Sequence, residues 1–346
     1  MGSVRPAVHI RRGTKDSVIL RAVASEAPEN GGSGKVDRES FMRVNINNSS
    51  TVEQLFQEAR MKGPCLIVAL LLIPATGFAQ SAPTDQVARC ESLITTQQQA
   101  AANPAREFSL DLRGEEGVRL RYFGVRHTFD PDDPQYATMQ SIWQELRPTE
   151  AFFEGTGTFV GDTITASLQR SGEPGLVRHL ASLTAIPVHS LEPTRAAEVE
   201  FLLPTFTAEQ LVLFFVSRAV AEERERPKLT APALEPLLIQ FLALAHATPE
   251  LAGVLPDLQA FRAAYARWFP GMVPELAPAR WFDPLHTSAE TGSQFHNDID
   301  RALSAFRDVY MYRLLARARR PGVRIFAEVG RDHIPAQAAA LRCAFN

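Results

Sequence analysis

Short apolar segments alternate with helix-like segments from about residue 119 to the C-terminus, and this alternation limits the folds open to the chain. The apolar segments cover 120–124, 150–153, 186–190 and 323–329. Strands that alternate with helices at this spacing predict parallel pairing in a sheet. We therefore expect an α/β fold, with a mostly parallel central sheet flanked by helices. A run of helical segments over about 195–285 predicts a helical insertion or cap.

Each apolar segment ends in a polar turn. The turns read Gly-Val-Arg-His-Thr, Glu-Gly-Thr-Gly, Ser-Leu-Glu-Pro and Gly-Arg-Asp-His, and they carry His127, Glu154, Glu192 and His333. In open α/β sheets, functional residues collect beyond the carboxyl ends of the strands. If the four strands are parallel neighbours, these side chains approach one another despite their distance in the sequence.

The two histidines suggest a metal site. Imidazole is the commonest transition-metal ligand and the usual acid or base at neutral pH. We expect His127 and His333 to bind a metal ion, with Glu154 as the third ligand or as a general base. The alternative is that Glu154 forms a structural ion pair, since a charge at the end of an apolar strand needs a partner. The region after residue 80 has too few cysteines for a thiolate site, so any metal must be held by histidine and carboxylate.

An arginine on a late helical segment could complete the site. Arg307 lies beside apolar residues in Ala-Phe-Arg-Asp-Val-Tyr, where it could bind a carboxylate or stabilise an oxyanion. The alternative is an exposed Arg307 that pairs with Asp308 or Asp300. His296 begins the same helix and could line the mouth of a site.

Three further residues are candidates for contact with the substrate: Glu173, Glu192 and Arg126. Glu173, in Arg-Ser-Gly-Glu-Pro-Gly, and Glu192, in Leu-Glu-Pro-Thr-Arg, both lie next to predicted helix starts. Each could instead be a carboxylate that the helix dipole favours.

The N-terminal part has the layout of an export signal. Residues 61–79 begin with Met-Lys, continue with an apolar run, and end in Pro-Ala-Thr-Gly-Phe-Ala, as secretory signal peptides do. The preceding residues, 1–60, are polar and contain Pro-Glu-Asn-Gly-Gly-Ser-Gly-Lys, a linker or disordered composition. We interpret 1–60 as a non-native upstream extension, and 80–346 as a single exported domain. A cytoplasmic tail before a signal anchor is the alternative.

The charge of residues 80–346 bears on which partners they could bind. Residues 80–346 hold 26 of the 36 basic residues and 32 of the 39 acidic ones. The resulting negative net charge gives no general attraction for nucleic acid or an anionic membrane.

The same region has two cysteines, Cys90 and Cys343. In an oxidising compartment they could form a disulfide, and the alternative is two unpaired thiols.

The ordered motifs Gly-Val-Arg-His-Thr, Phe-Phe-Glu-Gly, Arg-Ser-Gly-Glu-Pro-Gly, Phe-Arg-Asp-Val-Tyr-Met and Glu-Val-Gly-Arg-Asp-His resemble those of the TraB/Tiki superfamily, which is related to the erythromycin-esterase and ChaN-like proteins. The likeness runs from about 117 to 342. The first turn departs from the family pattern, where Gly-Thr-x-His is common, and 205–290 carries no matching motif.

The resemblance implies a site built from His127, Glu154, Arg307 and His333. Tiki-type members resemble metal-dependent peptidases that use ions such as cobalt or manganese. Other branches are esterases, haem-binding lipoproteins or proteins of unproven activity.

We therefore predict a secreted or periplasmic metal-dependent hydrolase that cleaves an amide (peptide) or ester bond. Its cofactor would be a divalent ion (Mn, Co or Zn), and its partner a peptide or small-molecule substrate. After removal of the signal peptide we expect no stable membrane span. The alternative is a non-catalytic protein of the same fold that binds haem or a metal.

Overall fold

The computed structural model of the chain divides into two compact units, Met1–Thr76 and Gly77–Asn346. The structure describes residues 7–12, 17–23, 40–45, 84–156, 159–224 and 234–346.

In the first unit, the described residues form an antiparallel sheet. Its order is β1 (Ala7–Arg12), β2 (Ser17–Val23) and β3 (Ser40–Asn45). All three strands fall within 1–60, for which the composition indicated a linker or disorder. The interpretation of 1–60 as an upstream extension stays a prediction, and the proposed signal peptide, 61–79, lies outside the described residues.

The second unit is the α/β domain that the alternating pattern predicts. Its sheet has the order β4 (Ser109–Arg113), β5 (Arg119–Val125), β8 (Arg324–Gly330), β6 (Glu150–Phe153) and β7 (Val188–Ser190). The edge pair β4–β5 is antiparallel, while β5–β8, β8–β6 and β6–β7 are parallel. The predicted α/β class with a mostly parallel sheet is confirmed.

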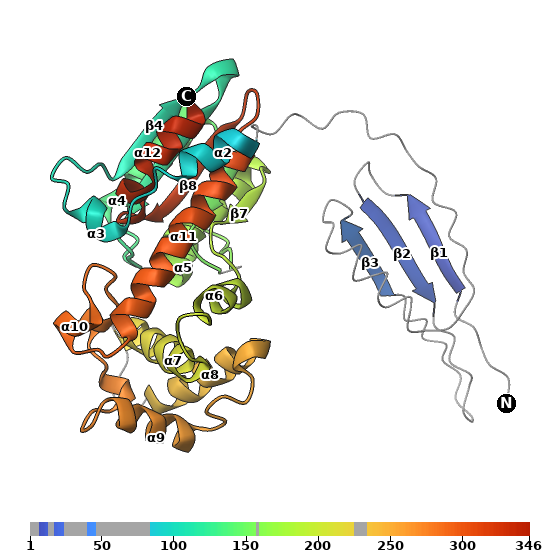
Figure 1. Ribbon diagram of the computed structural model, residues 1–346. Helices are drawn as coiled ribbons and strands as arrows, with labels where there is room; N and C mark the ends of the chain where they lie inside the picture. Colours follow the sequence, from blue (N-terminus) through green and yellow to red (C-terminus); the bar gives the residue numbers. More distant parts are fainter. Residues whose placement is uncertain (1–6, 13–16, 24–39, 46–83, 157–158, 225–233) are drawn as a thin grey trace, which may run out of the picture. The chain divides into compact units, whose positions relative to one another are not determined.

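Helices cover both faces of this sheet (Figure 1). Along the chain the α-helices are α2 (Thr84–Glu91), α3 (Gln97–Ala101), α4 (Pro134–Leu146), α5 (Ile164–Thr184), α6 (Arg195–Leu202), α7 (Ala208–Arg224), α8 (Leu234–His246), α9 (Leu258–Trp268), α10 (Ser288–Thr291), α11 (His296–Ala318) and α12 (His333–Phe345). The insertion expected near 195–285 corresponds to α6–α9 and the short turns that join them.

The central strand β8 separates two apolar layers. Its sequence, Arg-Ile-Phe-Ala-Glu-Val-Gly, is buried except at its ends, as expected for a parallel strand covered on both faces. Ile325 packs in one cluster with residues of α2, α11 and α12, and Phe326 packs in another with residues of α4 and α5. A third cluster lies within α6–α9 and includes Phe295, Ile299 and Leu303 of the α11 region. Helix α11 therefore extends from the helical insertion to the sheet (Figure 1).

Candidate functional site

The four predicted polar turns meet at one edge of the sheet. Because β5, β8, β6 and β7 run parallel, the segments that follow them leave the sheet at the same edge. His127 follows β5, Glu154 follows β6 and Glu192 follows β7, while His333 begins α12 after β8. The prediction that these residues approach one another is supported by the contacts of Glu154 described next.

Glu154 lies at the centre of the group. Its Oε1 accepts a hydrogen bond from Arg307 Nη2 at 2.6 Å and lies 3.7 Å from Nε2 of His333. Its Oε2 accepts a hydrogen bond from the backbone N–H of Gly330. Burial opposes ionisation of the carboxyl, but Arg307, the two imidazoles and the Gly330 N–H outweigh burial and lower the pKa of Glu154 to about 2. A carboxylate with such a low pKa is a weak proton acceptor, so its environment suits a ligand better than a general base.

Arg307 holds two carboxylates at once. Its side chain comes from α11 and is 8% exposed. Besides Glu154, its Nη2 donates to Oε1 of Glu192. Burial opposes the guanidinium charge, but the two carboxylates outweigh it and raise the pKa of Arg307. An exposed Arg307 paired with Asp308 or Asp300 was the wrong alternative.

A second carboxylate orients His333. Oδ1 of Asp308 lies 2.8 Å from Nδ1 of His333 and also accepts a hydrogen bond from Gln337 Nε2 at 2.8 Å. The hydroxyl of Tyr122 donates to Oε1 of Gln337 at 3.2 Å. Because a carboxylate only accepts, Nδ1 carries the hydrogen, and Nε2 is the nitrogen that faces Glu154. Burial disfavours the charged imidazole, but Asp308 and Glu154 outweigh it and raise the pKa of His333.

The carboxylate of Glu173 faces Nδ1 of His127, as that of Asp308 faces Nδ1 of His333. Its Oε2 lies 3.7 Å from Nδ1 of His127. Its Oε1 accepts the backbone N–H of Thr128 at 2.9 Å and Nε2 of Gln135 at 3.2 Å. The neighbouring carboxylate of Glu173 is the main reason that the pKa of His127 rises to about 9, although burial opposes the rise. The His127 side chain is 61% exposed, so it forms the open rim of the site.

Two glycines allow these close approaches. Gly172 interrupts α5 with a φ of 58°, a conformation that favours glycine, and the chain then presents Glu173 to His127. At Gly330, an added Cβ would lie 3.0 Å from Nε2 of His127 and 3.1 Å from Oε2 of Glu154. Both atoms therefore face the same small space beside Gly330.

The donor chemistry fits a divalent ion, although the atoms are not arranged around one. Two imidazoles have Nδ1 beside a carboxylate and Nε2 on the side of Glu154. A carboxylate beside the other ring nitrogen is the usual support of a metal-binding histidine. Four carboxylates, those of Glu154, Glu173, Glu192 and Asp308, face one guanidinium and two imidazoles, a balance that favours a cation. Within the described residues, no three His, Cys, Asp or Glu side chains are placed to hold a metal. Both oxygens of Glu154 are instead bonded to Arg307 and Gly330.

The remaining candidates have mixed outcomes. Glu173 and Glu192 pair with His127 and Arg307 within the site, and their predicted contact with substrate stays a prediction. Arg126 is exposed and pairs with Asp133 at 3.3 Å, and its role in substrate binding stays a prediction. His296 does not line a mouth: it is fully buried among aromatic rings, those of Phe214, Phe269, Trp281, Phe282 and Phe295.

Sequence reasoning missed the residues behind His333. Asp308 was weighed only as a partner of Arg307, and Gln337 and Tyr122 carried no motif. Gln97 was also missed, although its buried carboxamide lies 3.2 Å from Nδ1 of His333. The one usable signal was Asp308, which follows Arg307 on a helix and so projects from a different face.

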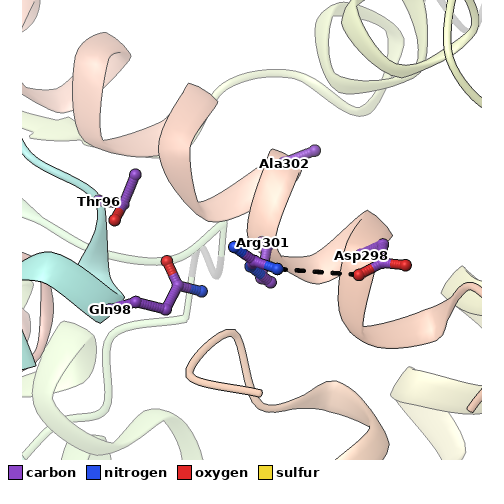
Figure 2. A pocket seen from close by; sticks show the side chains of 5 residues that line it. All are labelled: Thr96, Gln98, Asp298, Arg301 and Ala302. Atoms are coloured by element: carbon purple, nitrogen blue, oxygen red, sulfur yellow. Dashed lines mark ion pairs between the residues drawn. The ribbon is translucent and has the colours of Figure 1, made fainter. Parts of the chain in front are cut away.

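Two cavities lie between α2–α3 and α11. One of about 200 Å³ is lined by Thr96, Gln98, Asp298, Arg301 and Ala302, and Figure 2 shows the two α3-side residues facing the three from α11. The other, of about 370 Å³, also includes Thr96 and extends along α2. None of the predicted site residues lines either cavity, so the site is identified by its side-chain contacts and not by a hollow.

The disulfide between Cys90 and Cys343 is present, with a Cα–Cα distance of 5.6 Å. It joins α2 to α12, and α12 begins with His333.

In the part of the chain that the structure describes, no helix is both long and apolar enough to cross a membrane. Comparison with known proteins gives no match to a family model, to a curated protein or to a solved structure.

Proposed function

We propose that the chain is an exported, metal-dependent hydrolase that cleaves an amide or ester bond at the site around Glu154. The proposal agrees with the resemblance of its motifs to the TraB/Tiki superfamily. The disulfide between Cys90 and Cys343 supports a location in an oxidising compartment.

One observation carries the proposal: two histidines, each with Nδ1 beside a carboxylate, present Nε2 to the same third carboxylate. Glu173 lies beside His127 Nδ1 and Asp308 beside His333 Nδ1. Nε2 of His333 lies 3.7 Å from Glu154 Oε1, and Nε2 of His127 faces the same space beside Gly330 as Glu154 Oε2. A purely structural role would not require both imidazoles to converge, and one of them is open to solvent. The convergence at the carboxyl edge of parallel strands is where ligands bind in this type of sheet.

In this proposal, His127, His333 and Glu154 would hold a manganese, cobalt or zinc ion. The ion would supply Lewis acidity toward the substrate carbonyl. Asp308 and Glu173 orient each imidazole with Nδ1 toward a carboxylate and Nε2 toward the place where the ion would bind, and binding of the ion would displace the proton from Nε2. Arg307 holds Glu154 and Glu192 in place and presents positive charge at the side of the site where negative charge develops in acyl transfer. Substrate enters at the rim formed by the exposed His127.

The test compares three histidine variants of the purified chain. We expect bound metal and hydrolysis of a peptide and ester library in the parent and in His286→Ala. His286 is a suitable control because it is exposed and pairs with Asp283, away from the site. Both His127→Ala and His333→Ala should lose metal and activity, with metal content read by mass spectrometry.

The proposal is wrong if the parent takes up none of the three metals, or if neither site variant changes metal content or hydrolysis. A Soret band after incubation with haem that depends on His127 or His333 would support the non-catalytic, haem-binding alternative.

A further inference from the structure

The segment formed by α2, α3 and the turn between them reaches the site from outside the sheet. It lies beside α11 and α12 (Figure 1). The disulfide joins Cys90 of α2 to Cys343 of α12. Beyond it, the backbone N–H of Thr95 donates to the carbonyl of Ala336 at 3.0 Å. Both bonds attach the segment to the helix that begins with His333.

Gln97 is the point where this segment contacts the site. It is the first residue of α3, and its side chain is 7% exposed. Thr96 caps the helix, because its hydroxyl accepts the N–H of Gln99 while the Gln99 side chain accepts the N–H of Thr96. This capping box fixes the direction of the first turn, and the Gln97 carboxamide reaches Nδ1 of His333 at 3.2 Å.

Gln97 and Asp308 contact the same imidazole nitrogen from different elements. Asp308 takes the Nδ1 hydrogen at 2.8 Å. The Gln97 atom at 3.2 Å from Nδ1 is the amide nitrogen, which only donates, so a hydrogen bond to the protonated Nδ1 requires the amide to be turned by half a turn, with its oxygen as the acceptor. The ring of His333 therefore lies between α11 and α3.

We propose that Gln97 is a positioning residue for His333, and that the Cys90–Cys343 disulfide keeps Gln97 in place. The consequence for metal binding rests on the proposed function. The orientation of the His333 ring by Gln97 does not.

Open space lies along part of the α11 side of this segment. The two cavities of about 200 and 370 Å³ lie between this segment and α11, and Thr96, next to Gln97, lines both. Figure 2 shows Thr96 and Gln98 across the smaller cavity from α11. A segment with open space beneath it gains little dispersion energy from that side. The segment is held by the disulfide, by the packing of Val87 and Cys90 in the cluster around Ile325, and by bonds to α11 such as that of the Tyr312 hydroxyl to the carbonyl of Val87 at 2.9 Å.

The test reads the His333 imidazole directly in the metal-free protein. Nitrogen-15 spectra of histidine side chains report the hydrogen bond at Nδ1 without any assumption about activity. We expect Gln97→Ala to shift the Nδ1 resonance of His333. The matched control is Gln98→Ala, in the same helix, because the Gln98 side chain donates to the carbonyl of Pro284 instead. A double variant, Cys90→Ser with Cys343→Ser, should shift the His333 resonance in the same direction as Gln97→Ala.

A second arm measures Co²⁺ affinity by calorimetry. We expect binding about tenfold weaker in Gln97→Ala, the size found for residues that support metal ligands, and unchanged binding in Gln98→Ala. A His333 resonance that is the same in Gln97→Ala as in Gln98→Ala overturns the proposal, whatever the double cysteine variant does. If the resonance shifts but no variant or parent binds Co²⁺, the positioning role stands and the proposed metal site fails.

Discussion

Oδ1 of Asp308 lies 2.8 Å from Nδ1 of His333, and this bond decides which ring nitrogen faces Glu154. With Nδ1 committed to Asp308, Nε2 is available at the centre of the site. The pair joins α11 to the start of α12, and it lies beneath the site, where solvent does not reach the carboxylate.

Asp308→Ala should weaken metal binding by about 10- to 100-fold, because His333 would lose the partner that fixes its tautomer. The same change leaves the Gln337 amide with only the weak acceptor Met311 Sδ at 3.7 Å, and it should cost about 1–3 kcal/mol of unfolding free energy. Asp298→Ala is the control, since Asp298 lies on the same helix and pairs with Arg301 at 4.0 Å. Calorimetric titration with Mn²⁺ or Co²⁺ measures the first effect and urea unfolding the second. Equal affinities in the two variants would contradict the prediction.

Gly330→Ala should open the site without unfolding the sheet. The new methyl group would lie 3.0 Å from His127 Nε2 and 3.1 Å from Glu154 Oε2, tighter than most contacts of a Cβ atom, so one of these side chains must shift. Because the His127 side chain is exposed, it can swing outward at little cost. We expect loss of metal binding or hydrolysis with a circular dichroism spectrum like that of the parent. Retained binding would mean that His127 and Glu154 do not act at the same point.

The sheet and the meeting of its turns could be predicted from the sequence because they depend on local patterns. Apolar runs, glycines and polar ends recur at the spacing of strands and helices, and parallel pairing brings those ends together. The partners of the site residues could not be predicted in this way. Gln97 and His333 are separated by 236 positions, and no local pattern encodes a contact over that distance.

The ion-pair partners of Arg307 could not be inferred from the acidic residues near it in the sequence. Its nearest acids in the sequence, Asp308 and Asp300, suggested an exposed ion pair. Successive helix residues point about 100° apart, so Asp308 faces His333, while Asp300 binds Arg218 at 2.9 Å. The acids that bind Arg307 come from the ends of β6 and β7.

Removing the disulfide should destabilise the second unit strongly. Cys90 and Cys343 are 253 positions apart, and a link across so long a loop restricts the unfolded chain. We expect the Cys90→Ala, Cys343→Ala variant to lose about 3–5 kcal/mol of unfolding free energy. Urea unfolding of both proteins measures the difference. A loss below about 1 kcal/mol would mean that the unfolded chain keeps these ends together without the bond.

His296 should make the protein sensitive to acid. Burial among aromatic rings lowers its pKa to about 3, although its bond to the Ser293 carbonyl opposes the shift. Between pH 6.5 and about 3 the unfolded chain binds a proton that the folded chain does not, so stability falls as the pH falls, by up to about 1.4 kcal/mol per pH unit. Asp300, whose pKa burial raises to about 6, acts in the opposite sense. His296→Phe retains Asp300, so the difference in unfolding free energy between parent and variant isolates the effect of the imidazole. A difference that does not change with pH would contradict the assignment.

The buried carboxyl of Glu328 should make the folded protein less stable as the pH rises. Replacing this carboxyl by an amide should remove the effect. The residue lies in the middle of the sheet, beside Phe123 of β5 and Phe153 of β6, with no exposed surface. Neither carboxyl oxygen has a hydrogen-bond partner in the described part of the chain. Burial, helped by the charges of Glu173 and Glu154, raises the pKa of Glu328 well above its usual value. Above about pH 4.5 the unfolded chain releases this proton while the folded chain retains it, so the parent loses stability as the pH rises.

Glu328→Gln imitates the protonated carboxyl in shape and does not titrate. The variant should therefore gain on the parent by about 1 kcal/mol per pH unit between pH 5 and 7, measured by urea unfolding at each pH. The control Glu145→Gln, at an exposed residue that pairs with Arg119, should show no such trend, and a parent and Glu328→Gln variant with parallel pH profiles would mean that Glu328 is ionised in the folded protein.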